Sequence, residues 1–442
     1  MKLKSSLFFA KSLIFPRTDK KSTARKSIIS SILCIGLSFV PLIIVLTMTN
    51  SMISGMTERI IEISSSHLSV LLKRASDFNS SYKNFCEFAE KFENISGVKS
   101  VKKEIDCEAL AVTQKFRTGC QVRAVEFEKF FKNQKISSLL EITSGKIDFE
   151  NVNKKTAVIG SEIAQKLNLS PGDNFRIVLT KKSQNQTVIP KIVNLTVSAV
   201  VSSGYKEIDS LWIFVPVEEN FENFSRESSV FSVLIETPDA FSSDLGVICA
   251  NVAKKARPNA VAYTWKQMNQ WRFENFQSTK IMLYFVMILI VLVTAINISS
   301  ALVMLVMERK KEIAILKSLG ATKNSIAFSF LVTGGFCGLC GVLLGLPFGI
   351  LCSINLNEII LFFEKVVNFF VQFLDSFLGS KVSAEYVHLL DPDFYLSRIP
   401  IQIPIFEILL SSFFMILLAV VVSLLPSIKA GKQNILSIFN GN

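Results

Sequence analysis

Four long apolar segments are the feature that most limits what this chain can fold into. Each is longer than the roughly 20 residues that cross a hydrocarbon core about 30 Å thick. The only charge within them is Glu407, near one end of the last segment. Helices buried in soluble domains rarely run so far without a charge, and 50% of all residues are hydrophobic. We therefore predict an α-helical membrane protein with four transmembrane helices at residues 28–50, 281–307, 326–354 and 405–426.

The first segment has the features of an uncleaved anchor rather than of a secretory signal peptide. Its apolar run is longer than the roughly 7 to 15 residues of a signal peptide's central region. The residues that follow, Thr49-Asn50-Ser51-Met52, lack the small-residue pattern of a cleavage site. We expect this segment to remain in the membrane.

The positions of lysine and arginine predict which side of the membrane each part occupies. The chain has 48 of these residues against 36 acidic ones, giving a formal net charge of +12. They gather before residue 28, in the loop after residue 307 and in the tail. Because positively charged loops stay in the cytoplasm, both termini are predicted to be cytoplasmic. The basic surplus then needs no nucleic-acid partner.

The long region between the first two apolar segments has the pattern of a mixed α/β domain. Short alternating runs predict strands, among them residues 68–72 and 193–201, and residues 81–92 predict a helix. The helical spacing of residues 50–63 and 265–280 extends the first and second transmembrane helices into this domain as stalks. Two such stalks would couple movements of the domain to movements of the membrane helices.

These patterns predict a large mixed α/β extracytoplasmic domain inserted between the first and second transmembrane helices. The predicted parts are a cytoplasmic N-terminal segment (1–27), the first transmembrane helix (28–50), the outer domain with its stalks (51–280), the second transmembrane helix (281–307), a cytoplasmic segment (308–325), the third transmembrane helix (326–354), an outer loop (355–404), the fourth transmembrane helix (405–426) and a cytoplasmic tail (427–442).

The outer loop begins with an apolar stretch that is not a fifth transmembrane helix. Four charged residues interrupt it, namely Glu358, Glu364, Lys365 and Asp375. Its apolar residues recur at every third or fourth position, which is the spacing of one helix face. We therefore predict an amphipathic helix at the outer surface of the membrane.

No pattern of residues predicts catalysis or metal binding. The chain has 2 histidines, and it contains no nucleophile elbow, zinc-protease or phosphate-binding-loop motif. We predict no catalytic residue, no metal and no cofactor in this chain. The predicted outer region holds four cysteines that allow three pairings, and the sequence does not choose among them: Cys86, Cys107, Cys120 and Cys249.

The segment between the second and third transmembrane helices carries the strongest functional signal. Ile313, Leu316 and Leu319 recur at helical spacing, and charges fill the other face. A loop that only obeys the positive-inside rule would explain the basic residues but neither the apolar stripe nor the two acids. We predict a helix that inserts into a groove of a cytoplasmic partner, with contact residues Glu308, Arg309, Glu312, Ile313, Leu316, Lys317, Leu319 and Gly320.

The third transmembrane helix carries two rows of glycine. Such rows let helix backbones approach closely, so we predict tight packing against other helices. The general tolerance of glycine in membrane helices is the competing explanation. The two rows are Gly334 with Gly338, and Gly341 with Gly345 and Gly349.

The run NISSALVMLVMERKKEIAILKSLGATKNSI resembles the MacB/FtsX-type permease family. Two further runs, TNSMISGMTERIIEISSSHLSVL and DPDFYLSRIPIQI, are similar to the LolC/LolE-type permeases of the lipoprotein-releasing system. The resemblance covers both membrane ends well and the outer domain loosely, through VIGSEIAQKLNLSPGDNFRI and GYKEIDSLWIFVPVEE.

This resemblance implies a transport complex in a bacterial inner membrane. Two permeases, either two copies or a pair of sisters, would sit on a cytoplasmic ABC ATPase dimer that binds ATP and Mg²⁺. Lipoproteins would be taken from the outer leaflet of the membrane and handed to a periplasmic chaperone. A β-hairpin hook that contacts the chaperone would correspond to residues 181–192, with Lys181, Gln184 and Pro190 as contact candidates.

Other functions stay open beside this one. A MacB/FtsX-type permease for another substrate, or a regulator of periplasmic enzymes, shares the same membrane pattern. A membrane-anchored scaffold without transport would leave the amphipathic segment at residues 308–325 unexplained. The sequence does not distinguish a homodimer from a sister pair, or a LolC-like from a LolE-like role, and it does not identify the lipoproteins.

Overall fold

The computed structural model describes the chain as two compact units. It describes residue 10 and residues 23–72, 81–150, 152–182, 188–225, 229–256, 258, 260–378 and 399–432. One unit is helical and comprises Met1–Ser51, Phe276–Glu385 and Ile399–Asn442. The other contains a β-sheet and comprises Met52–Asn275 and Tyr386–Arg398.

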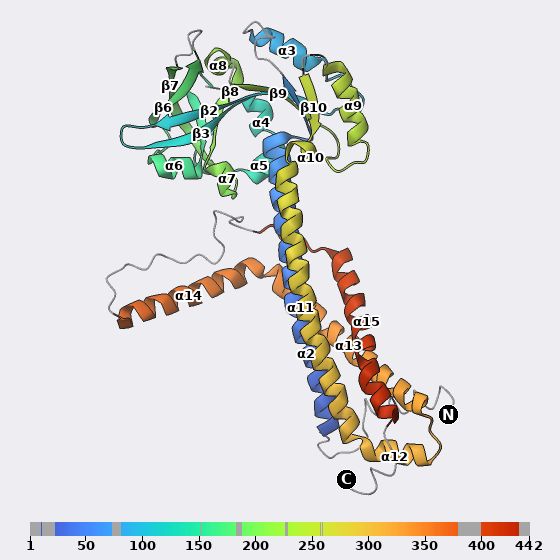
Figure 1. The fold of residues 1–442 in the computed structure, drawn as a ribbon. Helices are drawn as coiled ribbons and strands as arrows, with labels where there is room; N and C mark the ends of the chain where they lie inside the picture. The colour runs from blue at the N-terminus through green and yellow to red at the C-terminus, as the bar shows by residue number, and fades with distance from the viewer. Residues whose placement is uncertain are drawn as a thin grey trace. The chain divides into compact units, whose positions relative to one another are not determined.

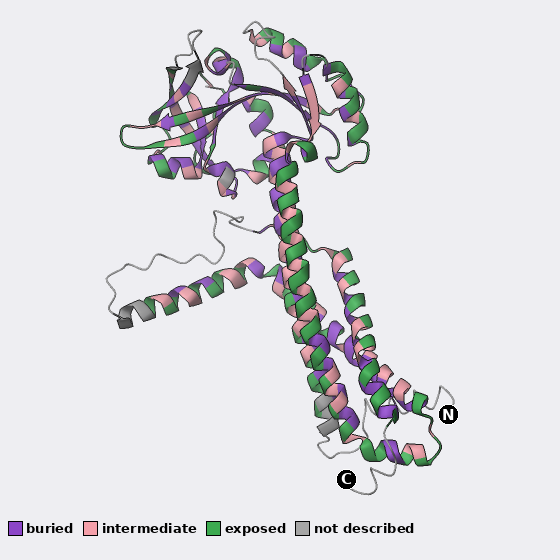
Figure 2. Cartoon of the chain, in the orientation of Figure 1, coloured by how far each residue is buried: buried purple, intermediate pink, exposed green. Residues whose placement is uncertain are grey.

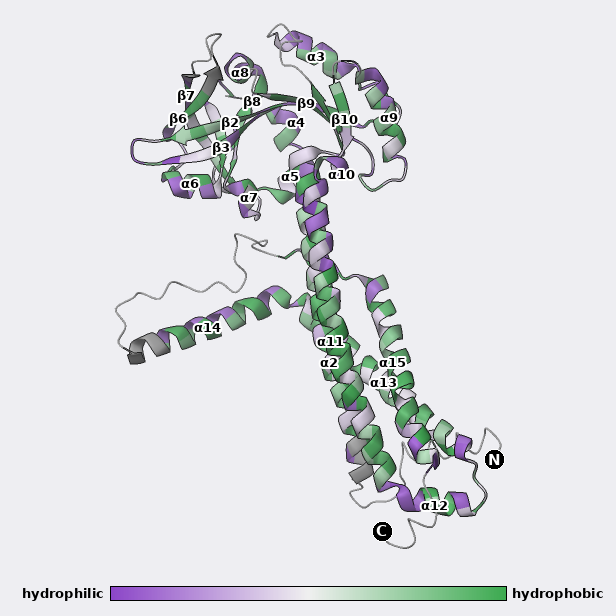
Figure 3. Cartoon of the chain, in the orientation of Figure 1, coloured by the Kyte–Doolittle hydropathy of each residue, from purple (hydrophilic) through white to green (hydrophobic). Residues whose placement is uncertain are grey.

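Among the described residues, 4 helices are long and apolar enough to cross a membrane, and each contains one of the apolar segments predicted above (Figure 1, Figure 3). They are α2 (Thr23–Arg59), α11 (Gln270–Glu308), α13 (Lys323–Ile354) and α15 (Ile405–Lys432). The helical unit also includes α12 (Lys310–Ser318) and α14 (Leu356–Leu378).

The stalk expected at residues 265–280 begins with a break. A short helix α10 (Trp265–Met268) is followed by Asn269, which is not helical, and α11 then runs without interruption from Gln270. The start of α10 is fixed by Thr264, whose hydroxyl caps the helix while the Gln267 side chain bonds back to the Thr264 backbone. The first helix, α2, extends well beyond its apolar segment and passes at Arg59 into a π-helical turn, η1 (Ile60–Ser65).

Helix α13 packs tightly because its two glycine rows face different neighbours. A Cβ atom at Gly338 would lie 2.5 Å from the Ala419 side chain of α15. A Cβ atom at Gly345 would lie 2.7 Å from the Gly36 carbonyl oxygen of α2. Such approaches exclude every larger residue, so the glycines bring α13 against α15 on one side and α2 on the other.

The sheet unit is a mixed α/β structure built on one ten-stranded sheet (Figure 1). The strand order is β10-β1-β9-β2-β3-β8-β5-β7-β4, and β6 pairs with β2 and β7. Strands β3 and β8, and strands β5 and β7, are parallel, whereas the other pairs are antiparallel. The strands are β1 (Leu68–Leu72), β2 (Ser100–Val112), β3 (Arg117–Val125), β4 (Glu141–Gly145), β5 (Thr156–Gly160), β6 (Asn174–Lys182), β7 (Val188–Ser202), β8 (Trp212–Pro216), β9 (Val230–Glu236) and β10 (Ala260–Thr264).

Short helices cover the sheet and close a continuous apolar core (Figure 2). Phenylalanines hold this core together, as where Phe85 of α3 meets Phe231 of β9 edge to face with ring centroids 5.5 Å apart. The helices of this unit are α3 (Tyr82–Glu90), α4 (Phe127–Phe131), α5 (Gln134–Leu139), α6 (Ser161–Leu167), α7 (Lys206–Asp209), α8 (Val217–Phe224) and α9 (Leu245–Ala256), with η1 and α10 at its base.

The close approach of α13 and α2 yields a test of the glycine packing. Gly345→Ala is expected to lower the thermal stability of the detergent-solubilised chain, because its new Cβ would meet a backbone carbonyl that cannot rotate away. Overpacking of this kind costs about 1–3 kcal/mol. The measurement is the midpoint of thermal unfolding.

The matched control is Gly335→Ala in the same helix, where a Cβ would meet only the Val420 side chain, at 3.2 Å. Both substitutions add the same helix propensity. Equal midpoints for the two variants would show that the packing of Gly345 does not limit the helical unit.

Candidate functional site

Helix α12 joins two of the long helices and is held between two sharp turns. It begins after Arg309, whose backbone conformation ends α11. It ends at Ser318, and Gly320, two residues further on, has a φ of 92° that other residues rarely adopt. The Ala321 amide donates to the Leu316 carbonyl at 3.0 Å, so the last turn is closed. Thr322 then caps α13 by accepting from the Ser325 amide.

The two sides of α12 have different neighbours. Ile313 and Ala314 are fully buried, and Ile313 belongs to the core of the helical unit. On the opposite side, Ile315 is 52% exposed and Leu319 is 79% exposed, while Leu316 is half-buried. The exposed apolar face is therefore made by Ile315, Leu316 and Leu319.

This arrangement corrects one of the predicted contact residues. Ile313 was expected to enter a groove of a partner, but its side chain is 0% exposed and is used by the chain itself. The segment has two apolar stripes about half a turn apart, and helical spacing alone does not tell which one faces the bundle. Ile315, which was not among the predicted contacts, takes the exposed place.

Lys317 also lies on the inner side of α12. Its Nζ donates to the Gly431 carbonyl at 2.8 Å, near the end of α15. Gly431 is itself close to the start of α13, because a Cβ there would lie 2.6 Å from the Lys323 carbonyl oxygen. Lys317 therefore fixes α12 to the end of α15, which itself lies against the start of α13, in the way that a basic side chain satisfies terminal carbonyls.

The charged residues at the start of α12 are only partly paired. Arg309 forms an ion pair with Glu312, one turn further on. Among the described residues, the Nε and Nη2 atoms of Arg309 and the Oε2 atom of Glu308 are buried without a hydrogen-bond partner. Glu312 lies on the same side as the exposed apolar face and is itself exposed. An acidic residue thus borders the apolar surface, and its contact with a partner stays a prediction.

The predicted hook corresponds to a hairpin of β6 and β7. Beyond the residues that pair with the rest of the sheet, these strands continue as a two-stranded arm, with Thr180 opposite Pro190 and Lys181 opposite Ile189. Pro190 is exposed and tolerated because this part of β7 has β6 as its one partner strand in the described sheet. Gln184 lies outside the described residues. The roles of Lys181, Gln184 and Pro190 stay predictions.

The cysteines and acidic residues form no metal site in the described part of the chain, where no group of three or more potential ligands occurs. All eight cysteines are described and are free thiols. Burial raises the pKa of Cys120 to about 12. The three possible disulfide pairings of the outer cysteines are all absent from this structure.

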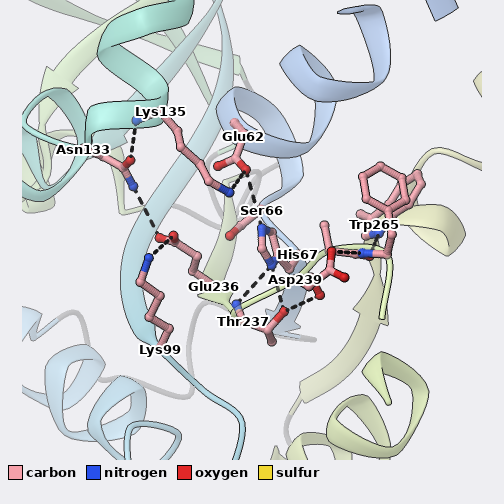
Figure 4. A network of polar contacts seen from close by, with 12 residues as sticks. Glu62, Ser66, His67, Lys99, Asn133, Lys135, Glu236, Thr237, Asp239 and Trp265 are labelled. Carbon is pink, nitrogen blue, oxygen red and sulfur yellow. Dashed lines mark hydrogen bonds and ion pairs between the residues drawn. The ribbon is translucent and has the colours of Figure 1, made fainter. Parts of the chain in front are cut away.

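A polar network around η1 and the end of β9 was not predicted from the sequence (Figure 4). The Thr237 amide donates to Nδ1 of the buried His67 at 3.1 Å. Nδ1 is therefore an acceptor and the hydrogen is on Nε2, which faces Glu62 at 3.6 Å. Lys135 donates to Glu62 at 2.7 Å. Burial alone would raise the pKa of Glu62, but the nearby His67 ring and the hydrogen bond from Lys135 lower it overall.

A second unpredicted group is the buried Arg123 of β3. It forms ion pairs with Glu104 and, at 3.4 Å, with Asp106, and its guanidinium stacks on Trp212 with 4.1 Å to the ring centroid. Burial and the nearby Glu104 carboxylate raise the pKa of Asp106 well above its usual value. Only the charges placed within otherwise apolar strands could have signalled this group in the sequence.

Two protein families match this chain. The family of MacB-like periplasmic core domains matches residues 29–261, and the family of FtsX-like permease C-terminal regions matches residues 284–435. The first match alone covers more than half of the chain.

Individual relatives agree with these families. The lipoprotein-releasing system transmembrane protein LolC of Neisseria meningitidis serogroup B is 24% identical over 278 residues, which are 62% of this chain and 62% of the relative. LolC of Xylella fastidiosa (strain Temecula1) is 27% identical over 53% of this chain and 56% of the relative. LolE of Haemophilus influenzae is 23% identical over 62% of this chain and 62% of the relative. The chain thus spans about six-tenths of these relatives' lengths. Together with the two family matches, these similarities show that it belongs to the MacB/FtsX-like permeases of the LolC/LolE type.

Proposed function

We propose that this chain is the permease subunit of an ABC transporter that extracts lipoproteins from the outer leaflet of a bacterial inner membrane. ATP hydrolysis would take place in a separate ATPase subunit, and the lipoprotein would pass to a periplasmic chaperone. The observation that carries this proposal is α12, an amphipathic helix with an outward apolar face in a chain whose relatives are named for lipoprotein release.

The exposed face of α12 suits insertion into an apolar groove on the ATPase. Ile315 and Leu319 point away from the helical unit, whereas Ile313 and Lys317 hold the opposite side in place. A helix fixed on one side transmits a push or a tilt to the helices that it joins. Glu312 would pair with a donor at the rim of the groove.

The proposed topology places both termini and α12 in the cytoplasm and the sheet unit in the periplasm. It is supported by the basic residues before α2, in α12 and at the end of α15. Within the sheet unit, the arm of β6 and β7 is the proposed contact for the chaperone. A second copy of this chain or a sister permease would complete the path for the lipoprotein.

Helix α14 is proposed to lie in the outer surface of the membrane. Glu364 is 8% exposed and Asn368 is 5% exposed, so two polar side chains are packed inside the structure. A helix that buries polar residues and exposes aromatic ones is suited to lipid rather than to water. Its exposed apolar residues are Leu361, Phe362, Phe363, Phe369, Phe370 and Phe373.

The face assignment of α12 gives the test of the proposed function. Leu319→Asp and Ile315→Asp are expected to weaken ATPase binding by about 30-fold or more, since loss of a central apolar anchor costs roughly 2 kcal/mol or more. The measurements are co-purification of the ATPase and lipoprotein-stimulated ATP hydrolysis. Lys311→Ala, which changes an exposed charge on the same helix, should leave both almost unchanged.

Ile313→Asp separates folding from binding in this experiment. It places a charge in the core of the helical unit, so it should lower thermal stability, whereas Leu319→Asp should not. Normal ATPase binding by both the Leu319 and Ile315 variants would refute the proposed role of α12. Release of no lipoprotein by the assembled wild-type complex would refute the proposed substrate.

The placement of α14 is tested by fluorescence quenching with brominated lipids. In the reconstituted chain, Phe370→Trp should add strongly quenched emission, because position 370 is on the exposed aromatic face. Gln372→Trp, on the polar side of the same helix, is the matched control. The native tryptophans contribute equally to both variants and to the parent chain. Equal added quenching at the two positions would contradict an interfacial helix.

A further inference from the structure

The segment that joins α2 to the sheet has an unusual backbone. Its last helical turn, η1, is a π-helix, a form that occurs mostly as single turns and often at functional sites. The next residue, Ser66, has a φ of 52° and a ψ of −169°, a conformation that residues other than glycine rarely adopt. The surrounding structure must hold these residues, because such backbones cost free energy.

Arg123 of β3 stabilises this backbone through two hydrogen bonds. Its Nη1 donates to the Ile63 carbonyl at 2.7 Å and its Nη2 donates to the Ser64 carbonyl at 3.1 Å. Both acceptors belong to η1, where the end of a helix leaves carbonyls without partners. The side chain of Arg123 is 2% exposed, and its bond to the Ile63 carbonyl is buried.

Other bonds tie the same segment to neighbouring elements of the sheet unit. Arg59 donates through Nε to the Ser203 carbonyl at 2.6 Å. Asn269, between α10 and α11, donates to the Ser65 hydroxyl at 3.3 Å. The Trp265 amide donates to the His67 carbonyl at 3.1 Å. The π-helical turn that follows α2 is therefore joined to α10 and to Asn269, the residue that precedes α11.

Stability alone does not account for a buried arginine with two acids. Buried ion pairs add little net stability relative to apolar residues of similar volume. The planar guanidinium does fix the positions of the carbonyl groups that it binds. Its N–H donors point in fixed directions within one plane, an arrangement that a lysine ammonium cannot reproduce. Glu104 and the stacked Trp212 hold the other side of that fork.

We infer that Arg123 is a positioning residue that makes the joint between α2 and the sheet rigid, so that movement of α2 reaches the sheet unit. Without Arg123, η1 would deform when α2 moves, and the movement would not reach the sheet unit. The inference rests on the proposed function, because the movement is the one that ATP hydrolysis would drive during lipoprotein release.

The test compares three variants of the full chain in the complex with its ATPase, reconstituted in vesicles. The readout is the ratio of lipoprotein released to ATP hydrolysed. Arg123→Lys should lower this ratio by about fivefold or more, the lower end of typical coupling between sites. Arg117→Lys makes the same change at an exposed position of the same strand and should leave the ratio unchanged.

Glu104→Gln distinguishes a joint from an ordinary ion pair. It removes the charge of the partner but keeps an amide oxygen that can accept from Nε of Arg123, and it leaves the bonds to the two carbonyls in place, so the ratio should stay near that of the wild type. An unchanged ratio in Arg123→Lys, or an equal loss in Glu104→Gln, would overturn the inference. Where Arg123→Lys does not fold, Arg123→Gln combined with Glu104→Gln removes both charges and takes its place.

Hydrogen exchange gives a second readout that does not depend on transport. Amides of residues 60–66 should exchange faster in Arg123→Lys than in Arg117→Lys, while those of β5 stay protected. Equal exchange in the two variants would also overturn the inference. If the wild-type complex releases no lipoprotein, the proposed function fails, and the exchange experiment still decides whether Arg123 holds η1.

Discussion

The close approach of α13 to α2 and α15 is the interaction on which the helical unit depends. Lipid tails are as apolar as leucine, so helices gain little there from burying apolar side chains and must pack through shape. Gly338 and Gly345 provide that shape by letting a side chain and a backbone carbonyl approach α13 directly. The inner side of α12 rests on the same unit, because Ile313 belongs to its core and Lys317 donates to the Gly431 carbonyl near the end of α15.

Much of the fold could be predicted from patterns that are local in the chain. The four long helices follow from uninterrupted apolar segments, and both glycine rows follow from their spacing. The chain turns after α12 at Gly320, whose φ is positive. These features could be predicted because each depends on residues within one or two helical turns, where neighbours in sequence are also neighbours in space.

The parts that the sequence missed depend on contacts between distant residues. Ile313 and Ile315 are equally apolar, and only the packed bundle decides which one is buried. Arg123 reaches carbonyls that lie 60 and 59 residues earlier, so no local pattern could connect them. The π-helical turn likewise has no signature of its own in the sequence, because it is imposed by bonds from other elements.

The bond from Lys317 to Gly431 has an evolutionary consequence. The outer side of α12 has to match whatever surface it meets, so Ile315 and Leu319 are free to change together with a partner protein. The inner side contacts residues of the same chain, so a change at Lys317 would have to be compensated by a change at the end of α15. One nine-residue helix therefore carries two independent selective pressures on opposite faces, and homologues that differ in partner should diverge on one face while keeping the other.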